Sequence, residues 1–387
     1  VLREQFFSTI QLAVITKHQN HHEIDKKTGK QVSFGVVRVA NIAPCIELTR
    51  FLLNADWPDG VEVRVMAYHS QQILLMRSEQ EKHLDQVLKR KSGSQVVFDQ
   101  AVIRAHLESI ESKNVIFILV ATPVEEVGRD HDFDWAVVEP SSFRSFIQLA
   151  GRVLRHRTQT ESLLEPNISL LQYNLKGVLL QAEERDKPVF CRPGYESEHH
   201  RLESHDLTQL LEVEKLAKRL DAELRISKKS TLRPTQDLAD LEHEVIHTLL
   251  TDYTQRGPES MQGWLSSCWW LTGIPQQLVK FRRGAAQLTV FRVPDEDEWC
   301  FVEKGRYGQP YSKIEKTYSI EVDERLTRRE QARFWLQRDY PQLLEGLGRS
   351  NLERAALVYG EINLPTYGKD ANNLSFHYSS QFGLVAK

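Results

Sequence analysis

Val115-Ile116-Phe117-Ile118-Leu119-Val120 is an unbroken apolar run of strand length. Such a run predicts a strand that is buried on both faces, as the strands of parallel sheets are. Strand-like stretches also lie at residues 35–39, 61–67 and 136–138, and helix-like stretches alternate with them. This β-α-β-α order predicts an α/β fold: a RecA-like parallel sheet lobe with helices on both faces. Ligands of such sheets bind at the carboxyl ends of the strands.

Three helices are expected around these strands. Asn41 can cap a helix that follows the strand at 35–39. Ser78-Glu79-Gln80-Glu81 has the pattern of a capping box that would open a second helix. The apolar spacing from Phe143 to Arg157 predicts a third helix over all of these residues.

The composition sets limits on the class of protein. The chain has 387 residues, of which 41% are hydrophobic and 27% are charged, so two or three domains with sizeable cores are expected. The 50 basic and 53 acidic residues give a net charge of -3, which excludes a uniformly basic nucleic-acid-binding protein but allows a local basic groove. The four cysteines are far apart and form no C-x-x-C, which indicates a reducing cytoplasm. No apolar run reaches the roughly 18 residues of a membrane span.

The character of the sequence changes near residue 181. We expect an α/β lobe over residues 1–180, a helical linker over 181–257 and a small mixed α+β domain over 258–387. Within the last two segments, the predicted helices and strands cover residues 207–224, 237–250, 288–291, 318–320 and 327–337.

The stretch Gln148-Leu149-Ala150-Gly151-Arg152-Val153-Leu154-Arg155-His156-Arg157 is the most informative polar feature. On a helix, at about 100° per residue, Gln148, Arg152 and Arg155 would share one face. Two arginines on one face suit a phosphate group, because the guanidinium stays charged and binds phosphate through two nitrogens. The alternative is an amphipathic helix whose basic face is simply solvated.

Polar residues also follow three of the predicted strands, and they are Asn41, His69, Ser70, Thr122, Gly128 and Asp130. The carboxyl ends of parallel strands lie at the same edge of a sheet. We therefore expect these residues and the arginine segment to converge on one rim, where they could contact a strand of nucleic acid or a ribose.

These motifs resemble those of superfamily 2 helicases. The order T-x-x-x-E-x-G-x-D from Thr122 to Asp130, followed by Q-x-x-G-R-x-x-R from Gln148 to Arg155, is similar to motifs V and VI of that superfamily. With Asn41 and Tyr68-His69-Ser70 in the motif IV region, the sequence most closely resembles the CRISPR-associated helicase–nuclease of type I systems, subtype I-F. The resemblance covers residues 35–157, the second RecA-like lobe. The later residues resemble the linker and C-terminal domain of that family only in their order along the chain and in their size.

The resemblance implies roles in ATP hydrolysis for four kinds of residue. Arg152 and Arg155 would reach the ATP phosphates across the cleft between two lobes, and one of them would act as an arginine finger. Gln148 would stand beside the γ-phosphate, so that Gln148, Arg152 and Arg155 form the catalytic set. Gly128 and Asp130 would belong to the ATP-binding residues and link the state of ATP to the path of DNA.

The resemblance also implies contacts with single-stranded DNA. The residues expected to touch its backbone are Asn41, His69, Ser70 and Thr122. Contacts with phosphate and sugar are tolerant of base sequence and weaken as the salt concentration rises. Position 123 departs from the family, because Pro123 stands where many members have Gln.

The activity that the family implies is ATP-driven 3′-to-5′ translocation on single-stranded DNA, recruitment by a CRISPR RNA-guided surveillance complex, and degradation of the invading DNA. Other CRISPR proteins and phage-encoded inhibitors are further expected partners, and a membrane is not. No G-x-x-x-x-G-K-[ST] loop is present, and Asp295-Glu296-Asp297-Glu298 reads as an acidic surface turn rather than a Mg²⁺ box. We therefore expect a C-terminal portion that is inactive alone. ATP and Mg²⁺ would be bound mainly by an absent first lobe, and the nuclease metal by an absent HD domain.

Two other functions are open at this point. One is a stand-alone RecA-like module that binds DNA or protein. The other is a zinc metallohydrolase, because His243-Glu244-Val245-Ile246-His247 fits H-E-x-x-H with Glu259 or Glu296 as a third ligand. That motif also arises by chance on a solvated helix face, and we predict no metal site.

Three further groups of residues have a structural interpretation beside a functional one. The histidines and the aspartate at 199–206 would form either a polar linker or a metal cluster. The tryptophans at 264–270 would pack in a core or stack on bases. Arg282 and Arg283 would be solvated or border a DNA groove.

Overall fold

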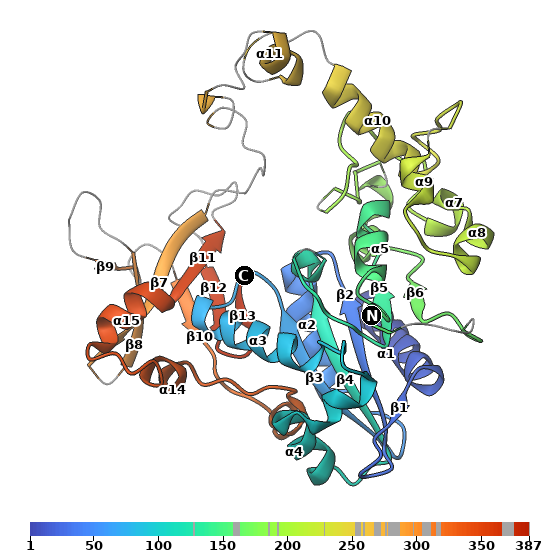
Figure 1. The fold of residues 1–387 in the computed structure, drawn as a ribbon. Helices are drawn as coiled ribbons and strands as arrows, with labels where there is room; N and C mark the ends of the chain where they lie inside the picture. Colours follow the sequence, from blue (N-terminus) through green and yellow to red (C-terminus); the bar gives the residue numbers. More distant parts are fainter. Residues whose placement is uncertain are drawn as a thin grey trace. The chain divides into compact units, whose positions relative to one another are not determined.

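A computed structural model (Figure 1) describes residues 1–126, 128–157, 163–184, 186–191, 193–227, 229–251, 257, 260–266, 272–274, 277, 287–296, 298–303, 311–314, 319–365 and 375–386. Unit 1 comprises Val1–Glu139, Gln148–Leu170 and Ala286–Lys387, and unit 2 comprises Pro140–Ile147 and Leu171–Ala285. The predicted three-part division at residues 180 and 257 stays a prediction.

The central sheet of unit 1 is parallel, as predicted. Its strand order is β3-β4-β2-β5-β6, and the short β1 pairs antiparallel with β2. The strands are β1 (Glu23–Ile24), β2 (Gln31–Arg38), β3 (Val61–Tyr68), β4 (Asn114–Ala121), β5 (Trp135–Val138) and β6 (Ile168–Leu170). The central β4 contains the apolar run 115–120, and every side chain of that run is buried.

Helices cover both faces of this sheet (Figure 1). They are α1 (Leu2–Asn20), α2 (Ile42–Asn54), α3 (Leu74–Val87), α4 (Ala101–Ser109) and the 3-10 helices η1 (Ser94–Asp99) and η2 (Pro123–Glu125). Successive side chains of a strand point to opposite faces. Ser33 therefore marks the face of α1, since its hydroxyl lies 2.8 Å from Nδ1 of His18, and Phe34 marks the other face.

The Phe34 face is completed by residues far along the chain. Phe34 stacks on Phe117 at 4.7 Å between ring centroids, and the fully buried Trp335 packs edge-on against Phe117 at 5.3 Å. The backbone of Trp335 donates a hydrogen bond to the carbonyl of Val65 on the edge strand β3. Residues 334–335 thus cover an apolar face and protect a strand edge that would otherwise be exposed.

The remaining elements of unit 1 form two smaller sheets, confirming the α/β class with a mixed C-terminal part. One has the antiparallel order β11-β7-β8-β9, and the other has the order β10-β12-β13. Their strands are β7 (Gln287–Asp295), β8 (Glu298–Glu303), β9 (Ser312–Lys313), β10 (Ser319–Val322), β11 (Glu361–Pro365), β12 (Ser375–Ser379) and β13 (Gly383–Ala386). The accompanying helices are α13 (Arg328–Arg333), α14 (Tyr340–Glu345) and α15 (Leu352–Tyr359).

Unit 2 is mainly helical within its described residues. Its helices are α6 (Leu175–Leu179), η3 (Ala182–Glu184), α7 (Leu207–Leu210), α8 (Val213–Lys218), α9 (Glu223–Ile226), α10 (Leu238–Thr251) and α11 (Met261–Ser266). Helix α5 (Phe143–Ala150) begins in unit 2 and ends in unit 1. No helix in the described part of the chain is both long and apolar enough to cross a membrane.

Two helix predictions were wrong for local reasons. Ser78 does not start a helix, because α3 already begins at Leu74 and buries Met76 in its first turn. The single helix predicted over 207–224 is three short ones. Side chains of Asp206 and Asp221 accept backbone hydrogen bonds from Thr208 and Glu223, and each starts a new turn.

The helix predicted over 327–337 begins as expected and ends early. Thr327 and Glu330 form a true capping box, in which each side chain accepts from the backbone of the other. The helix stops at Arg333, because the next two residues extend along the sheet edge described above.

Replacing Trp335 tests whether residues 334–335 are part of the core of the lobe. Trp335→Ala should lower the free energy of unfolding by about 3–5 kcal/mol, because it leaves a cavity against two phenylalanines. Trp335→Phe should lower the free energy of unfolding by clearly less. Urea denaturation measures both, and an unchanged Trp335→Ala midpoint would show that the segment is not integral to the lobe.

Candidate nucleotide and nucleic-acid site

The carboxyl ends of β2, β3 and β4 meet at one edge of the sheet, as predicted. Arg38 of β2 and Tyr68 of β3 both lie opposite Ala121 of β4, so the residues that follow these three strands leave the sheet side by side. Asn41 and Ser70 are exposed there. Thr122 is buried, and its backbone N–H donates to the carbonyl of Tyr68 at 3.0 Å.

His69 follows β3 as predicted, but its side chain turns into the interior of unit 1. Its ring is fully buried, Nε2 lies 2.8 Å from the carbonyl of Phe382, and Nδ1 accepts a hydrogen bond from the backbone of Gln71. Burial lowers the pKa of His69 to about 4, so the ring is neutral at pH 7. With both nitrogens in use, His69 anchors the C-terminal hairpin instead of facing a ligand.

The arginine segment is not a helix, contrary to our expectation, because α5 ends at Ala150. After it, Arg152 and Val153 make turn hydrogen bonds to Leu149 and Ala150. The chain then pairs with Phe133, which accepts from the N–H of Leu154 and donates to the carbonyl of Arg152. Leu154 takes a positive φ of 50° to make this reversal. A shared helical face therefore does not explain the placement of the two arginines.

Contacts with the loop after β4 place the arginines instead. Arg152 donates from Nη2 to the carbonyl of Glu126 at 3.0 Å. Arg155 donates from Nε to Asp130 at 2.7 Å and from Nη1 to the carbonyl of Gly151. Gln148 lies in the last turn of α5 and is half-buried. The predicted convergence of motifs V and VI is thus present, with a different local geometry.

Asp130 is the centre of these contacts. Hydrogen bonds from Lys91, Arg155 and His156 hold the pKa of its carboxyl far below the usual range. Gly128, two residues earlier, has a positive φ of 73°, a conformation that glycine adopts at little cost. This turn allows the loop to present Asp130 to the arginine segment.

A buried ion cluster beneath the site was missed by the sequence reasoning. Arg157 donates to Asp132 at 2.7 Å and to Asp134 at 2.6 Å, and Arg90 donates to Asp134 at 2.7 Å. Burial alone would raise the pKa of Asp134, but the charges of Arg90 and Arg157 outweigh it and lower that pKa. The sequence signal that could have revealed this cluster is the alternation of two aspartates with Phe133. In an extended chain, this alternation points both carboxylates to the same side.

The charge balance around the arginines fits a phosphate ligand. Burial and the nearby charge of Arg155 lower the pKa of Arg152. The buried Nε of Arg152 has no hydrogen-bond partner among the described residues. An anion beside Arg152 and Arg155 would relieve both effects. Phosphate is the anion that paired guanidiniums bind best.

The other sequence candidates have structural roles or lie outside the described residues. His243 on α10 lies 2.5 Å from the carbonyl of Arg225, and His205 lies 2.9 Å from Glu196. In the part of the chain that the structure describes, no three His, Cys, Asp or Glu side chains are grouped so as to hold a metal. Candidates outside the described residues are Glu259, Trp269, Trp270, Arg282 and Arg283.

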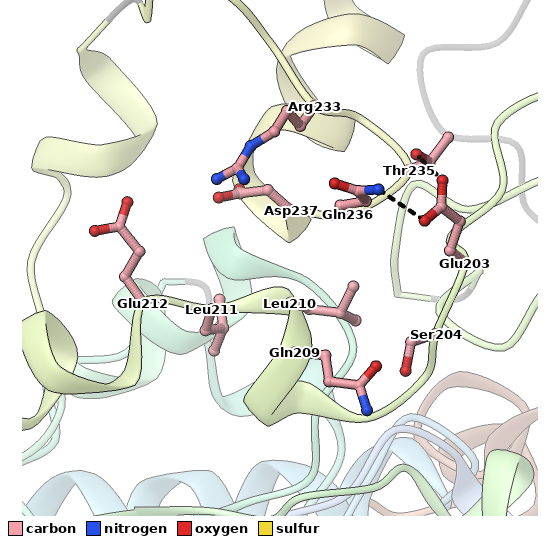
Figure 2. Close-up of a pocket in the computed structure, with 10 residues that line it drawn as sticks. All are labelled: Glu203, Ser204, Gln209, Leu210, Leu211, Glu212, Arg233, Thr235, Gln236 and Asp237. Atoms are coloured by element: carbon pink, nitrogen blue, oxygen red, sulfur yellow. Dashed lines mark hydrogen bonds between the residues drawn. The ribbon is translucent and has the colours of Figure 1, made fainter.

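Unit 2 contains a polar cavity of about 430 Å³ between α7 and the start of α10 (Figure 2). Its carboxylates are engaged in holding the fold. Glu203 accepts from Thr235 and Gln236 at 2.7 and 2.9 Å, and Asp237 pairs with Lys229 and caps α10. None of the predicted site residues lines this cavity, so the candidate site remains the rim of the sheet in unit 1.

Comparisons with known proteins find sequence relatives of this chain. Residues 31–158 match the family described as "CRISPR-associated nuclease/helicase Cas3, C-terminal". The chain is 36% identical over 356 residues to the CRISPR-associated nuclease/helicase Cas3 subtype I-F/YPEST of Pseudomonas aeruginosa, covering 90% of this chain and 32% of that protein. It is 36% identical over 294 residues to the protein of the same description from Pectobacterium atrosepticum, covering 74% and 26%.

Among solved structures, T. fusca Cas3-ATP aligns with a TM-score of 0.43 and 13% identity, over 92% of this chain and 37% of that one. A parallel α/β lobe with a charged rim at its strand ends is typical of a nucleotide- or nucleic-acid-binding protein. The sequence matches are all to Cas3, and the chain is homologous to the C-terminal portion of Cas3, subtype I-F. It spans about a third or less of the length of these curated relatives.

The buried His69 predicts a specific dependence of stability on pH. Its pKa is about 4 in the folded chain, against roughly 6.5 in an unfolded one, so protonation between these values favours unfolding. About 3 kcal/mol of stability is therefore present above pH 6.5 and lost as the pH falls to 4. Urea denaturation at several pH values should show that, as the pH falls, the free energy of unfolding decreases less for His69→Gln than for the wild type.

The exposed His377 is the matched control for this measurement. In His377→Gln, the free energy of unfolding should decrease with falling pH as much as in the wild type. If the same held for His69→Gln, the ring would not be held neutral in the folded chain.

Proposed function

We propose that this chain is the motor portion of a Cas3 protein that uses ATP to translocate 3′-to-5′ along single-stranded DNA and to degrade invading DNA in type I CRISPR interference. The observation that carries the proposal is the meeting of Arg152, Arg155 and Asp130 with the ends of β2, β3 and β4 on one edge of the sheet. The homology to the C-terminal portion of subtype I-F Cas3 supports it.

The arginines act on the phosphates of ATP. Phosphoryl transfer spreads negative charge over the transferred group, and a positioned guanidinium stabilises that charge. Arg155 is oriented by Asp130, and Arg152 is held by the carbonyl of Glu126, so both are positioned before a ligand arrives. Gln148, in the last turn of α5, stands beside the γ-phosphate in this proposal.

The rim beside the arginines contacts single-stranded DNA. Asn41 and Ser70 are exposed at the ends of β2 and β3 and can donate to phosphate oxygens. Thr122 follows the end of β4, the strand between β2 and β3, and is the third residue of this proposed contact. Such contacts position the strand without reading its bases.

The remaining parts of the activity belong to the rest of the proposed protein. A first RecA-like lobe holds most of the ATP and the Mg²⁺, and an HD domain holds the nuclease metal, so this portion alone is inactive. The whole protein works in the cytoplasm with a CRISPR RNA-guided surveillance complex, and other CRISPR proteins and phage-encoded inhibitors are further partners. Glu125 and Glu126 are buried in this portion and supply no open Mg²⁺ site.

A stand-alone binding module is the second candidate, favoured by the exposure of Asn41 and Ser70 without a phosphate cradle in the sequence. It differs from a motor in one measurable respect. A module binds DNA equally with and without ATP, whereas a motor changes its grip on DNA with the state of ATP.

Arg152→Ala in the full-length protein tests the catalytic role. We expect a loss of roughly 10³-fold in kcat for ATP hydrolysis, because one arginine finger is worth about that much, with binding of single-stranded DNA retained. Arg155→Ala in parallel shows which arginine is the finger. The control is Arg144→Ala, an exposed arginine of helix α5, which ends just before the arginine segment. An unchanged kcat in both Arg152→Ala and Arg155→Ala would rule out the proposed role.

Ser70→Ala and Asn41→Ala test the DNA contacts. Each should weaken binding of single-stranded DNA roughly fivefold, because one hydrogen bond is worth about 1 kcal/mol. Neither side chain is charged, so the salt dependence of binding should stay as in the wild type. Fluorescence anisotropy with strands of several sequences measures both quantities.

Ser109→Ala is the matched control for these variants. Ser109 is exposed and ends α4, which precedes β4, so it lies toward the opposite edge of the sheet. A defect confined to one DNA sequence, or an equal defect in Ser109→Ala, would contradict backbone contacts at the rim.

A further inference from the structure

Arg129 forms a cluster with Tyr68 and Glu81 that no sequence motif explains. The phenol of Tyr68, at the end of β3, donates to Glu81 Oε1 on α3 at 2.8 Å. Nη2 of Arg129, in the loop after β4, lies 2.5 Å from the same oxygen. The guanidinium of Arg129 also lies over the ring of Tyr68, 5.6 Å from its centroid. Three elements therefore meet at one carboxylate.

The cluster is shielded enough to be rigid. Tyr68 is fully buried, and the side chains of Arg129 and Glu81 are 20% and 24% exposed. An ion pair in such a setting is screened less by salt than a surface pair. Burial and the charge of Glu81 raise the pKa of Tyr68, so its hydroxyl remains a hydrogen-bond donor.

Each end of the cluster adjoins one half of the proposed site. Tyr68 directly precedes His69 and Ser70, and its carbonyl accepts from the N–H of Thr122. Arg129 directly precedes Asp130, which binds Arg155. Gly128 makes the turn that directs these two residues. Arg129 is thus joined to the arginine segment on one side and to the DNA rim on the other.

We propose that Arg129 is a positioning residue that holds the Asp130–Arg155 contact in a fixed relation to the Ser70 rim, so that binding of DNA accelerates ATP hydrolysis through it. This inference rests on the proposed function. Arg129 touches neither ligand, and it acts through Glu81 and Tyr68. Its loss therefore uncouples the two halves of the site and leaves each half intact.

The test measures ATP hydrolysis by the full-length protein with and without single-stranded DNA. In Arg129→Ala we expect the stimulation by DNA to fall roughly fivefold to tenfold, the size of a typical coupling between sites. The KM for ATP, the rate without DNA and the DNA concentration that gives half of the maximal stimulation should stay as in the wild type. Arg129→Lys, which keeps the charge, should recover part of the stimulation.

Three further variants locate the effect. Glu81→Gln should have the defect of Arg129→Ala, and the double variant should be no worse than either, because both residues act in one contact. Lys82→Ala is the matched control, since Lys82 is a basic residue of the same helix α3 but pairs with Glu79, at 3.9 Å, and not with Glu81. It should keep full stimulation.

The possible failures are distinguishable. A wild-type protein without stimulation by DNA would overturn the proposed function and this inference with it. Full stimulation in Arg129→Ala, beside a stimulated wild type, would overturn this inference alone. A fall in the rate without DNA that matches the fall with DNA would also overturn it, because Arg129 would then support the fold or the chemistry in general.

Discussion

The buried pairing of Arg157 with Asp132 and Asp134 is the constraint on which the candidate site depends. It ties the segment after α5 to the chain that enters β5, and Arg152 and Arg155 lie on that segment. A buried ion pair is costly to desolvate and is rarely retained for stability alone. Here it ties together two polar segments, and on one of them Arg152 and Arg155 contact Glu126 and Asp130.

The parallel sheet and the edge at which its strands end in polar residues could be predicted from the sequence, because they follow from local patterns. The run 115–120 and the polar residues that end each strand are sufficient for both. The end of α5 at Ala150 could not be predicted, since it depends on pairing with Phe133, a partner that helical spacing does not reveal. The burial of His69 could not be predicted for the same reason, because its partner Phe382 is 313 residues away.

The packing of Trp335 on the Phe34 face shows a further limit of local patterns. No pattern local to Trp335 reveals that it packs on Phe117 of the central sheet, or that residues 286–387 belong to unit 1. Apolar side chains that complete a distant face have no periodic signal of their own. The consequence for function is that the C-terminal hairpin at Phe382 and the rim at Ser70 belong to one folded unit, through the buried ring of His69.

We propose that this portion supplies the arginines of an ATP-driven motor and that another part of the protein supplies the phosphate cradle. The most direct measurement is ATP turnover with single-stranded DNA present, for the purified 387-residue chain and for the full-length protein. The account predicts turnover by the full-length protein and none by the chain alone. DNA-stimulated turnover by the chain alone would contradict it.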